Sequence, residues 1–145
     1  MTNENGRDPL ESSVFIQGLH RSGTTLLYQM LSESECFNSV WAWHVIRFDE
    51  IEAGCDDFVE SQERLQREFD RLGIDSRPDP IKIHPGMMEE YGFILDNRGF
   101  GSRLTQRSVP ELRHACNRIR NTQNCELPML LKNPWDFANG HQIKE

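Results

Sequence analysis

The most constraining feature of the chain is the segment Val14–Leu31, in which a strand pattern passes into a helix pattern across one short loop. Val14–Ile16 is an apolar run of strand-forming residues, and Gly18 ends it. Beyond Thr24 the apolar residues recur at helical spacing, as Leu26, Leu27, Met30 and Leu31. The segment therefore predicts a buried strand, a tight loop and a helix, in that order.

A second short apolar run, Met129–Leu131, predicts another buried strand near the end of the chain. Helices are predicted between the two strands. Asp56–Leu72 has one apolar face, and Gly73 supplies its stop. Ser108–Glu111 has the pattern of a capping box with proline in the first turn, which predicts a helix to about Arg120.

Short apolar strands separated by helical segments are typical of an α/β fold, a parallel sheet with flanking helices. Val40–Phe48 fits either a strand or a helix start, and its type stays open. Ligands of a parallel sheet bind at the carboxyl ends of its strands. Gly18–Thr25 and Lys132–Pro134 each directly follow a predicted strand, so we expect both at the same edge of the sheet.

Length and charge limit what the domain can be and bind. The 145 residues suit one domain, placed at residues 13–145 behind a polar, disordered leader at residues 1–12. The net charge is -7 and no basic block occurs, which argues against a nucleic-acid partner. No apolar run is long enough for a membrane span, and no signal-peptide pattern is present. The 4 cysteines have no paired or metal-binding spacing, so we predict reduced thiols and a cytoplasmic protein.

The loop Gly18–Thr25, GLHRSGTT, has the glycine spacing of a Walker A phosphate loop, but Thr24 occupies the position of its lysine. Glycines permit the tight turn, and backbone N–H groups at a helix start converge on an anion. Arg21 adds a positive fork, and Ser22, Thr24 and Thr25 add hydroxyl donors. Both the lysine for a triphosphate and a strand-ending aspartate for magnesium are missing. The loop therefore suits a diphosphate-like anion without an obligate metal.

The string GLHRSGTTLL resembles the loop by which sulfotransferases hold the 5′-phosphosulfate end of 3′-phosphoadenosine 5′-phosphosulfate (PAPS). Its RSGTTLL part is similar to the form in bacterial sulfotransferases and tyrosylprotein sulfotransferases. The resemblance implies a P-loop-like α/β domain that uses PAPS as sulfonate donor and requires no metal. It also implies that five consecutive residues belong to the donor site: Arg21, Ser22, Gly23, Thr24 and Thr25. His20 stands where relatives often have proline, so the resemblance gives it no role.

The string LLKNPW, residues 130–135, resembles a second segment of that family, in which a strand leads into Lys–Asn/Asp–Pro. The resemblance implies that Lys132 stabilises charge on the transferring group and on the leaving phosphate. A fixed cation beside the phosphate loop suits this role, because negative charge builds on the bridging oxygen as its bond to sulfur breaks.

Sulfonate transfer also requires a base, and His44 lies near the window, about twenty residues after the loop, in which related enzymes carry it. Its ordinary pKa of about 6.5 suits the role. Trp41 and Trp43 beside it would then form an apolar acceptor wall. A structural histidine packed against core aromatic residues explains the same pattern equally well.

Glu89 and Glu90 are the alternative candidates for the base. They belong to Met87–Tyr91, a stretch whose methionines and tyrosine fit an acceptor pocket. The same stretch also fits a helix start, where the helix dipole favours acidic residues.

Together these features predict transfer of a sulfonate group from PAPS to the hydroxyl or amine of a small-molecule acceptor. In the family, a later strand followed by Arg and Ser binds the donor's 3′-phosphate, and no apolar strand follows Pro134 here. We therefore expect the N-terminal part of a longer domain, or a chain that an oligomeric partner completes. Two alternatives stay open. One is a P-loop nucleotide-binding module or small-molecule kinase, which Thr24 argues against, and the other is a catalytically inactive truncated fragment.

Overall fold

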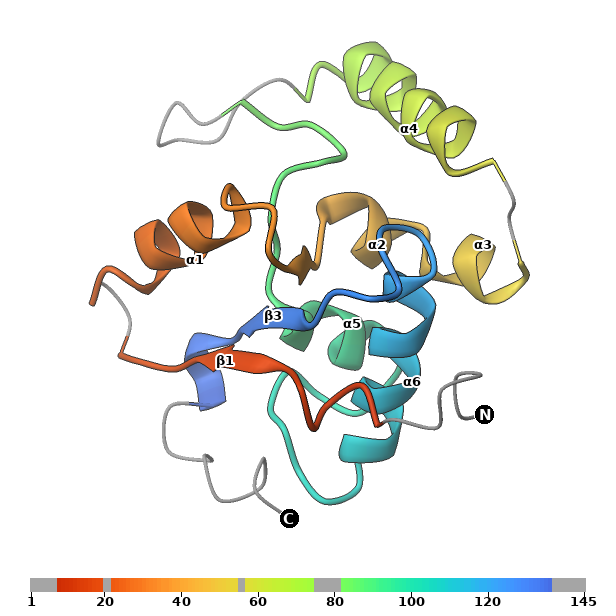
Figure 1. The fold of residues 1–145 in the computed structure, drawn as a ribbon. Coiled ribbons are helices and arrows are strands. Elements are labelled where there is room, and N and C mark those ends of the chain that lie inside the picture. Colours follow the sequence, from red (N-terminus) through yellow and green to blue (C-terminus); the bar gives the residue numbers. More distant parts are fainter. Residues whose placement is uncertain (1–7, 20–21, 55–56, 75–81, 137–145) are drawn as a thin grey trace.

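The computed structural model describes residues 8–19, 22–54, 57–74 and 82–136. Its elements follow in the order β1 (Val14–Ile16), α1 (Thr24–Ser32), β2 (Asn38–Ser39), α2 (Ala42–Ile46), α3 (Phe48–Glu52), α4 (Phe58–Leu72), α5 (Tyr91–Asn97), α6 (Val109–Arg120), β3 (Met129–Lys132) and the short 3-10 helix η1 (Pro134–Asp136). The predicted α/β class with a parallel sheet and flanking helices is confirmed (Figure 1). Residues 40–48, for which the sequence fits either a strand or a helix, contain α2 and the start of α3.

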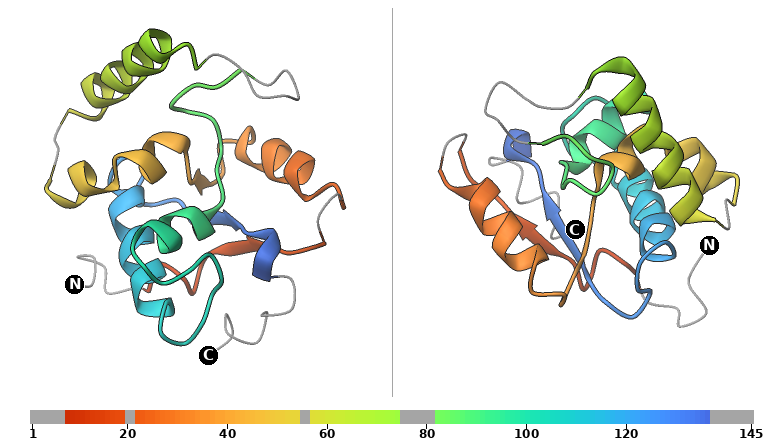
Figure 2. Two further views of the ribbon diagram at one scale, coloured as in Figure 1. Left: turned by 180° about the vertical axis from the view of Figure 1, so that it is seen from behind. Right: turned by 90° about the horizontal axis from the view of Figure 1, so that it is seen from above.

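The sheet has the strand order β1-β3-β2, and both strand pairs are parallel. Ile16 in β1 is paired with Lys132 in β3, so the two strands end at the same edge. Helix α1 lies on one side of the sheet, and α5 and α6 lie on the other (Figure 2). This arrangement places the loop after β1 and the turn after β3 next to each other.

Side chains of β3 alternate between the two faces of the sheet, as they do in any strand. Met129 and Leu131 belong to the core cluster under α5 and α6. Leu130 points the other way and packs with Ile16 and with Tyr28 of α1. Because Lys132 is two residues beyond Leu130, the same period directs its side chain to the face that α1 covers.

Two helix boundaries show how the sequence sets the elements, and one contact differs from its prediction. Asp57 caps α4 by accepting a hydrogen bond from the Glu60 amide, and Gly73 ends the helix with a left-handed backbone.

Helix α6 forms as predicted, but the predicted capping box at Ser108 is wrong, because the Ser108 side chain does not cap the helix. The Ser108 hydroxyl instead accepts a hydrogen bond from the Thr105 amide at 2.8 Å. The Ser108 backbone is already helical, whereas a capping residue is usually extended.

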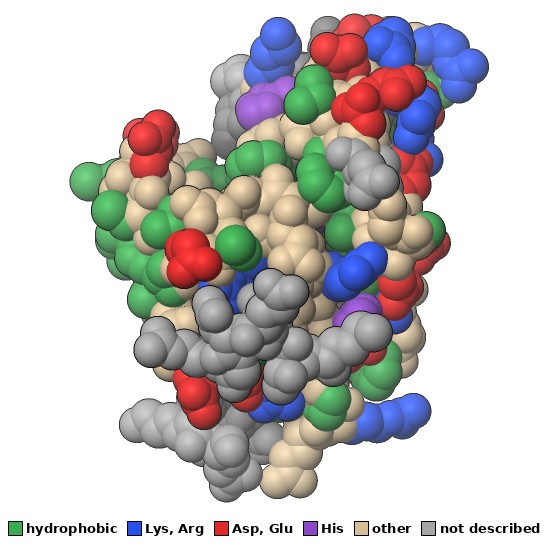
Figure 3. Space-filling view, turned by 45° about the vertical axis from the view of Figure 1, so that its right-hand side comes forward, with side chains coloured by type: hydrophobic (Ala, Val, Ile, Leu, Met, Phe, Trp, Pro, Cys, Tyr) green, Lys and Arg blue, Asp and Glu red, His purple; other side chains and the backbone are tan. Residues whose placement is uncertain are grey.

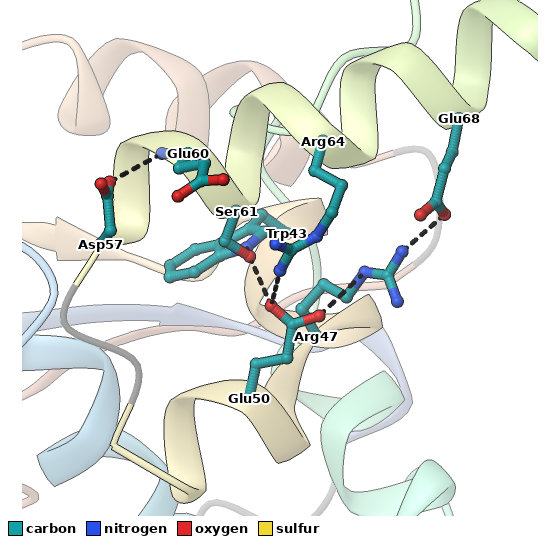
Figure 4. Close-up of polar contacts among 8 residues, drawn as sticks. All are labelled: Trp43, Arg47, Glu50, Asp57, Glu60, Ser61, Arg64 and Glu68. Carbon is teal, nitrogen blue, oxygen red and sulfur yellow. Dashed lines mark hydrogen bonds and ion pairs between the residues drawn. The ribbon is translucent and has the colours of Figure 1, made fainter.

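A polar cluster attaches α4 to α2 and α3 (Figure 4). The indole N–H of Trp43 donates to the Ser61 hydroxyl at 2.9 Å, and that hydroxyl donates to the Glu50 carboxylate at 2.7 Å. Arg64 donates to the same carboxylate oxygen at 2.7 Å. Beneath these polar contacts lies an apolar cluster of Trp43, Ile51, Leu65 and Phe69.

The surface divides into regions of different character (Figure 3). Acidic and basic side chains intermix over α4, at the top of that view. Hydrophobic side chains gather on the left, where α1 lies, and α1 exposes three large apolar residues: Leu26, Leu27 and Met30. No helix in the described ranges is long and apolar enough to cross a membrane.

Candidate functional site

Two glycines shape the described part of the loop between β1 and α1. A Cβ atom on Gly18 would lie 2.7 Å from the Thr24 methyl group and 2.8 Å from the Ser22 hydroxyl oxygen. The start and end of the loop are therefore in close contact. Gly23 has φ +82° directly before α1, a backbone conformation that glycine adopts without strain. Arg21 and His20, which stand between these glycines, lie outside the described residues.

The first turn of α1 borders a shallow hollow of about 480 Å³ lined by Gly23, Thr24, Thr25 and Leu26. The first amides of a helix have no partner within the helix, and the helix dipole makes this end positive. Thr24 and Thr25 add hydroxyl groups beside these amides. The hollow therefore borders amide and hydroxyl donors of the kind that an oxyanion requires.

Lys132 is a buried cation at this edge, with only 7% of the residue exposed. Its ammonium group donates to the Thr25 hydroxyl at 3.1 Å and to the Glu90 carboxylate at 2.7 Å. Two of its three N–H donors are used in these contacts. The prediction that the two strand-end motifs meet at one edge of the sheet is confirmed, since Lys132 contacts the first turn of α1 directly.

A larger cavity of about 530 Å³ adjoins this cation. Its lining comes from α1, from the segment 82–90 and from three further positions: Thr25, Tyr28, Gln29, Ser32, Glu33, Trp41, Lys82, His84, Gly86, Met87, Met88, Glu89, Glu90 and Lys132. Thr25 borders both this cavity and the hollow at the helix start. Lys132 and Glu90 are therefore at the junction between the first turn of α1 and a pocket of the size that holds small molecules.

Backbone pairing holds the segment 82–90 in place as one wall of the cavity. The amide of Ala42 donates to the Met87 carbonyl at 2.8 Å, and the amide of Glu89 donates to the Val40 carbonyl at 2.8 Å. These bonds flank an antiparallel bridge between Trp41 and Met88. The position of Glu90 is thus set by backbone contacts as well as by Lys132.

Tyr28 connects α1 to this wall, a role that sequence reasoning missed. Its hydroxyl donates to the Glu89 carbonyl at 3.3 Å and accepts from the Val40 amide at 3.2 Å. Burial raises the pKa of Tyr28, so the group remains a neutral hydroxyl. A tyrosine among the apolar positions of a predicted helix is a usable signal, because its oxygen must find a partner when it is buried.

His44 lies elsewhere, inside the fold. It has no exposed surface and is not among the described residues that line the cavity. The Trp41 amide donates to its Nδ1 at 2.9 Å, and its Nε2 is 2.9 Å from the Thr122 hydroxyl oxygen. Burial lowers the pKa of His44 to about 3, so the ring is neutral near pH 7. These contacts favour the structural interpretation that the sequence left open.

A buried carboxylate fixes the backbone just after Lys132, and sequence reasoning missed it too. The Asp136 carboxylate accepts hydrogen bonds from the Tyr91 hydroxyl at 2.6 Å, the Leu104 amide at 2.8 Å and the Asn133 side chain at 2.7 Å. Burial and the neighbouring Asp136 charge raise the pKa of Tyr91, which therefore stays a hydrogen-bond donor. An acidic residue soon after an apolar strand was the signal available in the sequence.

A model of the sulfotransferase family matches residues 13–145. The chain therefore belongs to the sulfotransferase family, as its two motifs predicted, and the general reaction of that family is sulfonate transfer. No curated protein and no solved structure matches the chain significantly.

Proposed function

We propose that the chain binds PAPS at the loop between β1 and α1 and transfers its sulfonate group to a hydroxyl or amine in the adjoining cavity. One observation carries the proposal. The Lys132 ammonium contacts both Thr25, at the start of α1, and Glu90, in the cavity wall. A cation at this junction is next to the donor and to the acceptor at the same time.

The donor side is assigned to Arg21, Ser22, Gly23, Thr24 and Thr25. Family membership and the likeness of RSGTTLL to bacterial and tyrosylprotein sulfotransferase loops support this assignment. The hollow over the first turn of α1 supports it as well, because its amides and hydroxyls suit phosphate oxygens. When bound, PAPS supplies a sulfonate group already joined to a good leaving phosphate.

Lys132 would stabilise the negative charge that develops on the bridging oxygen as the sulfur–oxygen bond to the phosphate breaks. Glu90 would take the proton of the acceptor as the new bond to sulfur forms. Glu90 lines the cavity and lies 2.7 Å from Lys132, whereas His44 is fully buried away from it. We therefore place the base at Glu90, with Lys132 neutralising charge and Glu90 accepting the proton.

Binding calorimetry tests the donor assignment. The chain is titrated with adenosine 3′,5′-bisphosphate in the presence of EDTA, and separately with ATP and magnesium. We expect binding of the bisphosphate without metal, weakened about tenfold or more by Lys132→Ala. Arg67→Ala is the control, because Arg67 is 64% exposed on α4 and pairs with Glu63. Binding of ATP with magnesium alone would instead support a P-loop kinase.

A further inference from the structure

Trp41, which lies between β2 and α2, contributes its aromatic ring to the cavity wall. Trp41 lines the cavity, while Trp43 is fully buried and does not. The bridge to Met88 brings a flexible thioether beside Trp41, and Met87 also lines the cavity. Aromatic and methionine side chains together form an apolar surface that adapts to a ligand.

Trp41 is held in position from behind. Its ring stacks on His44, with ring centroids 5.3 Å apart and an interplanar angle of 22°. His44 in turn contacts Trp43 at 5.0 Å, and Trp43 contacts Phe58 of α4 at 5.7 Å. The hydrogen bonds of His44 to the Trp41 amide and to Thr122 fix the imidazole in this row. The row of rings therefore runs from the apolar core to the cavity surface.

We infer that Trp41 recognises the acceptor by stacking, that the acceptor carries a flat, uncharged aromatic ring, and that His44 is the positioning residue for Trp41. A rigid ring backed by a second ring favours a flat ligand, because offset stacking requires two parallel planes. Three carboxylates border the cavity, on Glu33, Glu89 and Glu90, against the two ammonium groups of Lys82 and Lys132. This excess of negative charge disfavours an anionic acceptor. The volume of about 530 Å³ suits a molecule of one or two rings.

This inference rests on the proposed function, since it names the substrate class of the same site. Two matched probes test it: 2-naphthol, which is flat, and decahydro-2-naphthol, which has the same skeleton but is puckered. Each is titrated with and without saturating adenosine 3′,5′-bisphosphate. We expect 2-naphthol to bind at least about tenfold more tightly to the wild-type chain.

Trp41→Leu should reduce this preference to a factor of about two or less. Trp135→Leu is the matched control, because Trp135 is 44% exposed and does not line the cavity. It should keep the preference. Equal binding of the two probes, no binding of 2-naphthol, or an unchanged preference in Trp41→Leu would overturn the inference. Failure of the bisphosphate to bind would overturn the proposed function instead. The titrations without the bisphosphate would still test whether Trp41 recognises a flat ring.

The positioning role of His44 has its own readout. His44→Phe keeps a ring behind Trp41 and should keep most of the preference for 2-naphthol, while His44→Ala removes the ring and should lose it. Bisphosphate affinity should be unchanged in both variants, and unfolding curves identify the folded protein. If both folded variants lose the preference equally, the stack does not position Trp41. Should either variant fail to fold, Trp41→Leu decides whether stacking recognises the acceptor.

Discussion

The direction in which a residue at this site points depends on its position in a strand or at a helix end. Lys132 reaches Thr25 because it lies on the same face of β3 as Leu130, which packs against Tyr28 of α1. A shift of one residue would direct its side chain to the opposite face, where α5 and α6 pack. Gly23 likewise matters through its backbone, whose left-handed conformation starts α1 in the correct direction.

Gly23→Ala should therefore affect binding in a way that strain alone does not explain. The left-handed backbone costs a residue with a Cβ atom about 1 kcal/mol. Gly73, at φ +66°, is the matched control, because a Cβ atom at either glycine meets nothing within 4 Å. Urea unfolding should show a similar loss for both variants, but only Gly23→Ala should weaken bisphosphate binding. Equal bisphosphate affinities would show that the turn before α1 is not part of the donor site.

His44 should make the stability of the fold depend on pH. With its pKa lowered from 6.5 to about 3, the unfolded chain binds more protons than the folded chain between these values. The contribution of His44 is complete above pH 6.5 and is lost as the pH falls toward 3. Through His44 alone, the free energy of unfolding should be about 2 kcal/mol lower at pH 5 than at pH 8.

Urea unfolding of the wild-type chain and of His44→Gln at both pH values measures this effect. The other histidines are present in both proteins, so the difference between the two pH dependences isolates His44. The variant should be less sensitive to acid by that amount. Identical pH dependences would show that His44 is not buried as a neutral ring.

At the scale of elements, short segments are held together by single buried polar atoms. Tyr28 connects α1 to the cavity wall, and Asp136 fixes the turn after β3. Ser61 has the same function for α4, since its hydroxyl accepts from Trp43 and donates to Glu50. The hydrogen bond from Ser61 is the largest cause of the lowered pKa of Glu50. Elements this short have little stability of their own, so these contacts decide where they lie.

Ser61→Ala should therefore destabilise the chain by about 1–3 kcal/mol, because the Trp43 indole N–H loses its partner in a buried site. Ser34→Ala is the control, as Ser34 is exposed and bonds only within its own turn in the described contacts. Thermal or urea unfolding measures both. A loss for Ser61→Ala no larger than that of the control would show that this polar cluster does not hold α4.

For the molecule as a whole, the sequence predicted what depends on periodicity and missed what depends on packing. Two strands and their shared edge were predicted from the apolar runs Val14–Ile16 and Met129–Leu131. Helix α1 was predicted from the helical spacing after Thr24. The two-residue strand β2 is too short to produce a pattern. For Asp136 the sequence offered only the local signal of an acidic residue soon after an apolar strand, because its partners Tyr91 and Leu104 are distant in sequence. The Thr122 partner of His44 is distant in the same way.

The extent of the domain beyond this core, including the expected completion by a later segment or a partner, stays a prediction. The described part brings together the start of α1, Lys132 and the cavity wall. These three parts lie on one edge of the sheet because β1 and β3 are adjacent and parallel. The proposed function therefore requires that this edge of the sheet performs the reaction.

The most direct measurement is sulfonate transfer itself, followed as release of adenosine 3′,5′-bisphosphate from PAPS with 2-naphthol as acceptor and EDTA present. We predict turnover by the wild-type chain and by Arg67→Ala, and a loss of about a hundredfold or more in Lys132→Ala and in Glu90→Gln. Turnover that persists unchanged in Lys132→Ala would contradict the assignment of this edge as a sulfotransferase active site.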